Sequence, residues 1–176
     1  DGVSLLIPIY NGERYLESTL MSALDNPQGC MFEIIAVDDG STDGTSDILR
    51  IASLKAKNRG IVFRILQLDA NNGLICALEE GLKLCSYDFI ARLDADDLLE
   101  DHRLSKQKAF LEHNQDIHVV GSQAVQIYSD YAQPSRLIKG MPTHPVMIAW
   151  EMMFRCSVLH PSVMFRRRVI QDCGSY

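Results

Sequence analysis

The chain of 176 residues has 47% hydrophobic and 23% charged residues, which is typical of one compact globular domain and excludes a disordered or fibrous protein. Its formal net charge of -6 argues against a nucleic-acid-binding protein, because such proteins need a basic surface to neutralise phosphates. The five cysteines include no C-x-x-C pair, so buried or idle thiols in a reducing compartment are favoured over a metal or disulfide framework.

No segment approaches the roughly 18 consecutive apolar residues of a membrane-spanning helix, and the beginning of the chain lacks the pattern of a signal peptide. We therefore expect a cytoplasmic location or one at the cytoplasmic face of a membrane, which leaves peripheral membrane association open. The first residue is Asp1 rather than an initiator Met, so we expect a trimmed chain.

Strand and helix patterns alternate regularly over the first hundred residues. Continuous apolar runs predict buried strands at residues 3–9, 32–37 and 89–93, and a further strand at 61–68. Helical patterns fill the intervals: one ends near Asn26-Pro27, one carries Leu49, and one carries Leu78. Such alternation predicts an α/β fold with a mostly parallel, Rossmann-like sheet flanked by helices.

The alternation loosens after residue 100. The patterns predict a helix over 103–113, a strand around 119–128, a loop over 129–142, a helical stretch near 146–154 and a strand near 157–165. No repeat or linker divides the chain. We therefore expect a single domain over residues 1–176.

Polar residues follow three of the four predicted strands. Because ligands of open α/β sheets bind outside the carboxyl ends of the strands, we expect these residues on one rim. They are Tyr10-Asn11 after the first strand, Asp38-Asp39 after the second, and Asp94-Ala95-Asp96-Asp97 after the fourth.

The acidic cluster after the fourth strand has two interpretations. In an extended segment, residues two apart point the same way, so Asp94 and Asp96 would face one side and Asp97 the other. Two such carboxylates suit Mg²⁺ or Mn²⁺, with open positions for substrate phosphates. Alternatively, the cluster is a solvated turn in which Asp97 or Asp101 favours the dipole of the next helix. Its place at the end of a buried strand favours the metal site.

The pair Asp38-Asp39 also keeps two interpretations. Asp-Gly-Ser after a strand is a common turn sequence that can cap the following helix. A carboxylate at a strand end can equally accept hydrogen bonds from a nucleobase imide or a ribose hydroxyl. Spacing does not choose between them.

Three segments, VSLLIPIYN at 3–11, VDDGSTD at 37–43 and ARLDADD at 91–97, together resemble family-2 glycosyltransferases with the GT-A fold in order and spacing. The resemblance covers essentially the whole chain. A fourth segment, LHPSVMFR at 159–166, is similar to the one that these enzymes carry on the acceptor side. The family builds polysaccharides or glycoconjugates from nucleoside-diphosphate sugars, so the resemblance implies a UDP-linked donor, an acceptor hydroxyl and a divalent metal.

The resemblance also implies roles for individual residues. Asp39 would hold the base, Asp96 would coordinate the metal together with Asp94 in the D-x-D motif, and His160 would be a metal or acceptor contact. The remaining donor-binding residues would line or border the nucleotide and sugar positions. They are Pro8, Tyr10, Asn11, Glu13, Asn72, Gly73 and Ala95, with Asp94 approaching the ribose or sugar.

The family mechanism is an inverting single displacement in which a carboxylate base deprotonates the acceptor hydroxyl. In relatives this base lies some way after a segment like residues 173–176, so we expect it beyond Tyr176. The helix after Gly73 begins with less polar residues than in relatives, which leaves the donor nucleotide open.

Three other classes of protein are alternatives to a glycosyltransferase. A nucleotidyltransferase would carry a glycine-rich basic loop after the first strand, where this chain has Tyr10-Asn11-Gly12-Glu13-Arg14. A phosphotransferase with an aspartyl nucleophile would carry its D-x-D at the end of the first strand rather than the fourth. A non-catalytic nucleotide-sugar-binding module stays open, because the expected base is absent from these residues.

Overall fold

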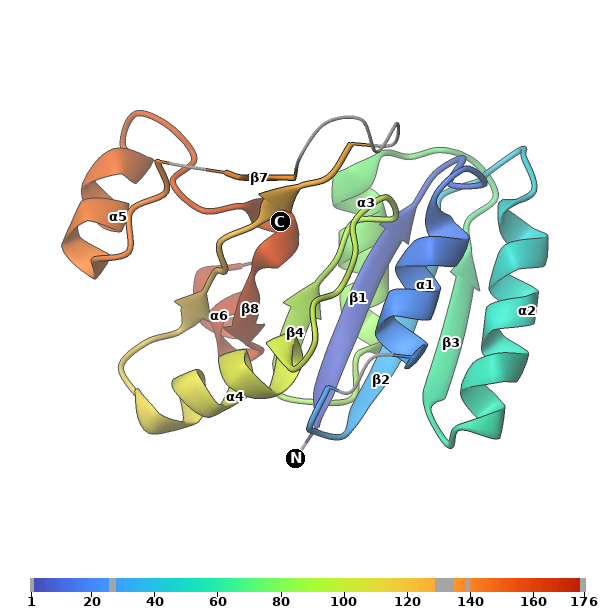
Figure 1. Ribbon diagram of the computed structural model, residues 1–176, viewed down its shortest axis with the longest axis horizontal. Coiled ribbons are helices and arrows are strands. Elements are labelled where there is room, and N and C mark those ends of the chain that lie inside the picture. The colour runs from blue at the N-terminus through green and yellow to red at the C-terminus, as the bar shows by residue number, and fades with distance from the viewer. Residues whose placement is uncertain (1, 26–27, 129–134, 139, 175–176) are drawn as a thin grey trace.

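The computed structural model describes residues 2–25, 28–128, 135–138 and 140–174. A six-stranded mixed sheet forms its centre, in the order β3-β2-β1-β4-β8-β5, and Figure 1 shows helices on both of its faces. The strands of this sheet are β1 (Val3–Ile9), β2 (Phe32–Asp38), β3 (Val62–Gln67), β4 (Phe89–Arg92), β5 (Val119–Val120) and β8 (Met164–Arg166). The α/β fold with a mostly parallel sheet is thus confirmed.

Strands β1 to β4 pair with one another in parallel, and β8 runs antiparallel to both β4 and β5. All seven residues of β1 are buried, since the strand has a neighbour on each side and helices on each face. Strand β3 lies at the edge of the sheet and is more exposed. The carboxyl ends of the four parallel strands therefore share one rim, as the alternating pattern predicts.

Helices cover the two faces unequally. The helices are α1 (Leu16–Asp25), α2 (Thr45–Asn58), α3 (Leu74–Leu84), α4 (Arg103–His113), α5 (Pro145–Met152) and α6 (Arg168–Cys173). One core cluster joins α1, α2 and α4 to one face of β1, and a second joins α3 to the opposite face. Each fully buried Leu or Ile in these clusters contributes about 1.5–3 kcal/mol.

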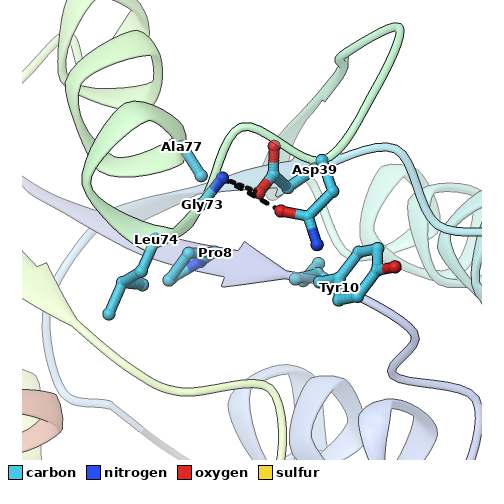
Figure 2. Close-up of a pocket in the computed structure, with 8 residues that line it drawn as sticks. Pro8, Tyr10, Asp39, Gly73, Leu74 and Ala77 are labelled. Atoms are coloured by element: carbon cyan, nitrogen blue, oxygen red, sulfur yellow. Dashed lines mark hydrogen bonds between the residues drawn. The ribbon is translucent and has the colours of Figure 1, made fainter.

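Helix α3 packs against the sheet through Gly81, where there is no room for a side chain. A Cβ atom on Gly81 would lie 2.3 Å from Leu6 Cδ1 and 2.8 Å from Val37 Cγ2, closer than packed atoms approach. The absence of a side chain therefore sets the height of α3 above β1 and β2. The first turn of the same helix, from Leu74, then lies beside the carboxyl end of β1 (Figure 2).

The prediction of one strand around residues 119–128 is wrong. Instead of one strand, the chain forms β5 and then β6 (Val125–Gln126), which pairs with β7 (Arg136–Leu137) in a separate two-stranded sheet. The reason lies at Ser122: its N–H donates to Ser162 Oγ at 3.0 Å, and its carbonyl accepts from the same hydroxyl. Strand β7 also falls within the predicted loop 129–142, of which residues 129–134 and 139 lie outside the described part.

The predicted strand at 157–165 is also largely wrong. Residues His160–Ser162 form a 3₁₀ turn, and strand pairing is confined to β8. Pro161 explains the interruption, because it has no N–H to donate and its ring fixes φ near the helical value.

Helix α5 confirms the helical stretch predicted near 146–154, but it has no buried residue. Apolar side chains on this helix and just after it are exposed to solvent: Trp150 at 58% on the helix, and Phe154 at 75% two residues after its end. Across the described residues, no helix combines the length and the apolar character needed to cross a membrane.

Candidate functional site

A cavity of about 250 Å³ opens at the carboxyl rim of the sheet. Its walls come from the end of β1, the residue after β2, the loop between β3 and α3, and the first turn of α3 (Figure 2). The lining residues are Pro8, Ile9, Tyr10, Asp39, Asn71, Gly73, Leu74 and Ala77. Four residues nominated from the sequence, Pro8, Tyr10, Asp39 and Gly73, thus surround one cavity.

Asp39 is the buried acid of this cavity, with 3% of its surface exposed. Its Oδ1 accepts the N–H of Asn72 at 2.9 Å and its Oδ2 accepts the N–H of Gly73 at 2.8 Å. Its own N–H donates to the carbonyl of Ile9 at 2.8 Å. A carboxylate offers about four acceptor positions, so two stay available after these bonds are made. Asp39 thus joins three segments of the rim and still keeps capacity to accept from a ligand.

Two glycines allow the backbone to close around Asp39. Gly40 has φ +71°, and a Cβ there would lie 2.5 Å from the carbonyl carbon of Ala70. Gly73 has φ +90°, a conformation open to few residues with a side chain, and this turns its N–H toward the carboxylate. The loop before α3 can therefore approach the end of β2 closely.

The two adjacent asparagines of that loop have different surroundings. Asn72, nominated from the sequence, donates its side-chain amide to the carbonyl of Ala70 at 2.7 Å and does not line the cavity. Asn71 lines it instead, and its Oδ1 accepts the N–H of Gly73 at 3.0 Å. Sequence reasoning missed Asn71. An asparagine two residues before a glycine often bonds its own backbone in this way, which was the available signal.

Asn11 and Glu13, also nominated for the nucleotide pocket, do not line it. Asn11 has a left-handed φ of 51°, its Oδ1 accepts the N–H of Thr42 at 2.9 Å, and its own N–H donates to Ser41 Oγ at 2.9 Å. Glu13 Oε2 accepts the N–H of Gly44 at 3.1 Å. Both residues join the loop after β1 to the loop after β2, and so hold the backbone beside Tyr10.

The acidic segment after β4 is a turn rather than an extended strand. The N–H of Asp97 donates to the carbonyl of Asp94 at 3.2 Å, so the expected alternation of side chains does not apply. Helix α1 holds the turn, because Thr19 Oγ1 donates to the carbonyl of Ala95 at 2.8 Å. The next helix begins with His102 as its N-cap, and neither Asp97 nor Asp101 occupies that position.

Charges accumulate within this turn. Asp94 is partly buried, with 33% of its side chain exposed, whereas Asp96 is exposed. Partial burial, reinforced by the neighbouring carboxylates of Asp94 and Asp96, raises the pKa of Asp97. A cation beside the turn would relieve this repulsion.

Arg92, the last residue of β4, lies beneath the acidic turn. Its side chain is 3% exposed, and its guanidinium bonds Asp94 Oδ1 at 2.7 Å and contacts His160 Nδ1. Burial and the Arg92 cation lower the pKa of His160, while Asp94 opposes the shift. The structure therefore brings His160, nominated for the acceptor side, next to Asp94 through the buried arginine.

The residues fit a divalent cation that is shared with a substrate, not one enclosed by protein. Within residues 2–25, 28–128, 135–138 and 140–174, no group of three or more His, Cys, Asp or Glu side chains could hold a metal. Mg²⁺ and its analogues are commonly held by one or two carboxylates together with substrate phosphates. Asp96 and the unpaired oxygen of Asp94 are the side-chain atoms that suit this arrangement.

The fold and the rim together define a GT-A glycosyltransferase architecture. The structure of TarS from S. aureus in complex with UDP superimposes with a TM-score of 0.74 and 22% identity, covering 98% of this chain and 49% of that one. The mannosyltransferase PcManGT from Pyrobaculum calidifontis, in complex with GDP-Man and Mn²⁺, gives 0.71 and 17% identity, over 99% of this chain and 47% of that one. At these identities the likeness concerns the fold alone.

The chain belongs to glycosyltransferase family 2, because the model of "Glycosyl transferase family 2" matches residues 4–174. The putative glycosyltransferase EpsE of Bacillus subtilis (strain 168) is 35% identical over 146 residues, which are 82% of this chain and 51% of that protein. A poly-beta-1,6-N-acetyl-D-glucosamine synthase of Staphylococcus epidermidis is 38% identical over 103 residues, 57% of this chain and 23% of that protein. The chain thus spans about half the length of EpsE, and the family membership expected from its motifs is confirmed.

Proposed function

We propose that this chain forms the donor-binding part of a glycosyltransferase that moves a sugar from UDP-sugar to an acceptor hydroxyl with inversion at the anomeric carbon. One observation carries the proposal: a cavity walled by Asp39 and Tyr10 opens on the same rim as the acidic turn. This rim can receive a base and a diphosphate from one ligand. The UDP and UDP-GlcNAc complexes of TarS, which shares this fold, support the choice of nucleotide.

The cavity has the chemistry to bind a uracil ring. Asp39 can accept the imide N–H, since it keeps acceptor positions after its two backbone bonds. Asn71 turns its Oδ1 toward Gly73, which leaves its amide N–H₂ group to donate to a ring carbonyl. The ring of Tyr10, 49% exposed, and the apolar surface of Leu74 can pack against the base.

Asp96, beside Asp94 in the acidic turn, would hold a Mg²⁺ or Mn²⁺ ion against the diphosphate. When bound, such a cation neutralises the charge that develops on the departing nucleoside diphosphate. The Mn²⁺ in the PcManGT complex supports this assignment. The turn itself is held by α1 through Thr19, so the backbone that carries these carboxylates is fixed before any ligand arrives.

His160 would face the acceptor, which we expect to be a carbohydrate or another hydroxyl compound. Burial and the Arg92 cation lower its pKa and so favour the neutral imidazole, which can contact a hydroxyl without adding positive charge. We do not assign the general base to Glu151, which pairs with Arg155, or to Asp172 on α6.

Calorimetry with UDP, GDP and CDP, each with and without Mn²⁺, tests the proposal. We expect UDP to bind most tightly and Mn²⁺ to increase its affinity. Asp96→Asn should remove the increase, while Asp101→Asn, an equal charge change at an exposed position nearby, should preserve it. Failure of all three nucleotides to bind in either condition would refute a nucleotide-sugar site. Unchanged Mn²⁺ dependence in Asp96→Asn would refute only the metal assignment.

A further inference from the structure

We propose that Arg92 is a positioning residue, whose buried guanidinium orients Asp94 so that this carboxylate accepts hydrogen bonds from a donor hydroxyl while Asp96 contacts the cation. This inference rests on the proposed function, since it concerns how the donor is held. The family resemblance implies that Asp94 approaches the ribose or sugar and that Asp96 coordinates the metal, but it does not say what holds the two carboxylates in these roles. The structure distinguishes them by a single ion pair.

Arg92 is in an environment that a cation occupies only with partners. The residue is 2% exposed, and its Nε lacks a hydrogen-bond partner among the described residues. Burying a charge is costly unless opposite charge and hydrogen bonds compensate it. Asp94 is the carboxylate in ion-pair contact with Arg92, so the pair holds Asp94 in one orientation.

This ion pair limits what Asp94 can do for a ligand. Its Oδ1 is bonded to Arg92 Nη2 at 2.7 Å, so Asp94 has only Oδ2 free of that bond. A carboxylate whose charge is compensated by a guanidinium attracts a cation less strongly than an unpaired one. Asp96 is exposed and makes no ion pair within the described part of the chain, so it is the better cation ligand. Asp94 is better suited to accept a hydroxyl hydrogen bond from the ribose or the sugar.

The backbone of Arg92 is held by hydrogen bonds that do not involve its own guanidinium. Arg103 Nη2 donates to the carbonyl of Arg92 at 2.8 Å and to that of Pro161 at 3.2 Å. The N–H of Arg92 donates to the carbonyl of Val163 at 2.9 Å, at the edge of β8. The backbone of Arg92 is thus fixed independently of its side chain. Replacing Arg103 should loosen this end of β4 without touching the Asp94 carboxylate, which makes it a matched control.

A double-mutant cycle on the whole chain tests the proposal. At saturating Mn²⁺, Arg92→Met and Asp94→Asn should each weaken binding about tenfold, the loss typical of one charge-assisted hydrogen bond. The double variant should lose no more than either single one, because both remove the same contact. Calorimetry with UDP and with UDP-N-acetylglucosamine distinguishes the hydroxyl: a loss with both ligands indicates the ribose, and a loss only with the second indicates the sugar.

Two further measurements separate positioning from structural support. Arg103→Met should lower the melting temperature yet keep both affinities within about twofold, whereas Arg92→Lys should recover part of the lost affinity. By electron paramagnetic resonance in the presence of UDP, Asp94→Asn should retain Mn²⁺ and Asp96→Asn should lose it. This last comparison stands even if Arg92→Met fails to fold.

Several results would refute the role proposed for Arg92. Losses that multiply to about a hundredfold in the double variant, a tenfold loss in Arg103→Met, or loss of Mn²⁺ in Asp94→Asn would each overturn the role of Arg92 and leave the donor site standing. If the unsubstituted chain binds neither UDP nor UDP-N-acetylglucosamine, the donor site and the role of Arg92 are refuted together.

Discussion

Replacing Asp39 with Asn should destabilise the protein even when no nucleotide is present. Each carboxylate oxygen accepts one backbone N–H, from Asn72 at 2.9 Å and from Gly73 at 2.8 Å. An amide can satisfy only one of them, and its NH₂ group then faces the other donor. Losing one charge-assisted bond beside partly buried groups costs about 2–3 kcal/mol. For a chain of this size, this corresponds to a fall in melting temperature of roughly 4–12 °C.

Thermal unfolding followed by circular dichroism, without nucleotide or metal, measures this cost. Asp69→Asn provides the control, because Asp69 is exposed in the same loop and its substitution changes the charge equally. We expect that control to melt within about 1–2 °C of the unsubstituted protein, as surface substitutions usually do. If Asp39→Asn melts with the control, the two bonds do not support the rim, and our account of the cavity is wrong.

Three other predictions concern single positions. Asn71→Asp keeps the acceptor for the N–H of Gly73 but loses the amide donor, so its affinity for UDP, measured by calorimetry, should fall at least tenfold more than that of Asn72→Asp, the adjacent charge-matched control. Equal losses in the two variants would mean that Asn71 does not contact the base. Gly81→Ala should lower the free energy of unfolding, measured in urea, by about 1–2 kcal/mol, because the steric clash of the new methyl group with the sheet outweighs the gain in helix propensity. A stabilised variant would contradict the close packing of α3 on the sheet. Burial raises the pKa of Cys85 to about 11, so its thiol stays protonated at pH 8, and iodoacetamide should label the exposed Cys156 first. Mass spectrometry measures the order of labelling, and equal labelling of the two thiols would indicate that Cys85 is accessible.

The parallel half of the fold was predictable because its information is local. Each strand of this half is a continuous run of four to seven residues, and its following helix carries its own apolar stripe, so periodicity alone identifies the unit. Strand β8 is different, because its partners in β4 lie about 75 positions away in the chain, as in the pair Phe89 and Arg166. No local pattern specifies such a pairing, and Pro161 further disguises where the strand begins.

The site shows the same division between local and distant information. Residue types at strand ends indicated Asp39 and Tyr10, and the structure places both around the cavity, although their donor-binding roles stay predictions. The choice between Asn71 and Asn72 could not be made, because it depends on the backbone of Gly73 at φ +90°. The bond between Asp94 and Arg92 was equally invisible, since spacing does not show which of two carboxylates a buried cation will contact.

The pairing of β8 with β4 has a consequence for the order in which the parts of the rim can form during synthesis. The cavity uses residues from Pro8 to Ala77, so all of its walls are synthesised before the acidic turn and His160. The contact between Arg92 and His160 needs a segment that leaves the ribosome much later. Because the chain leaves the ribosome with its N-terminal side first, the residues that line the cavity are available for folding before the segment that carries His160. The contact between Arg92 and His160 is therefore among the last parts of the rim that can form.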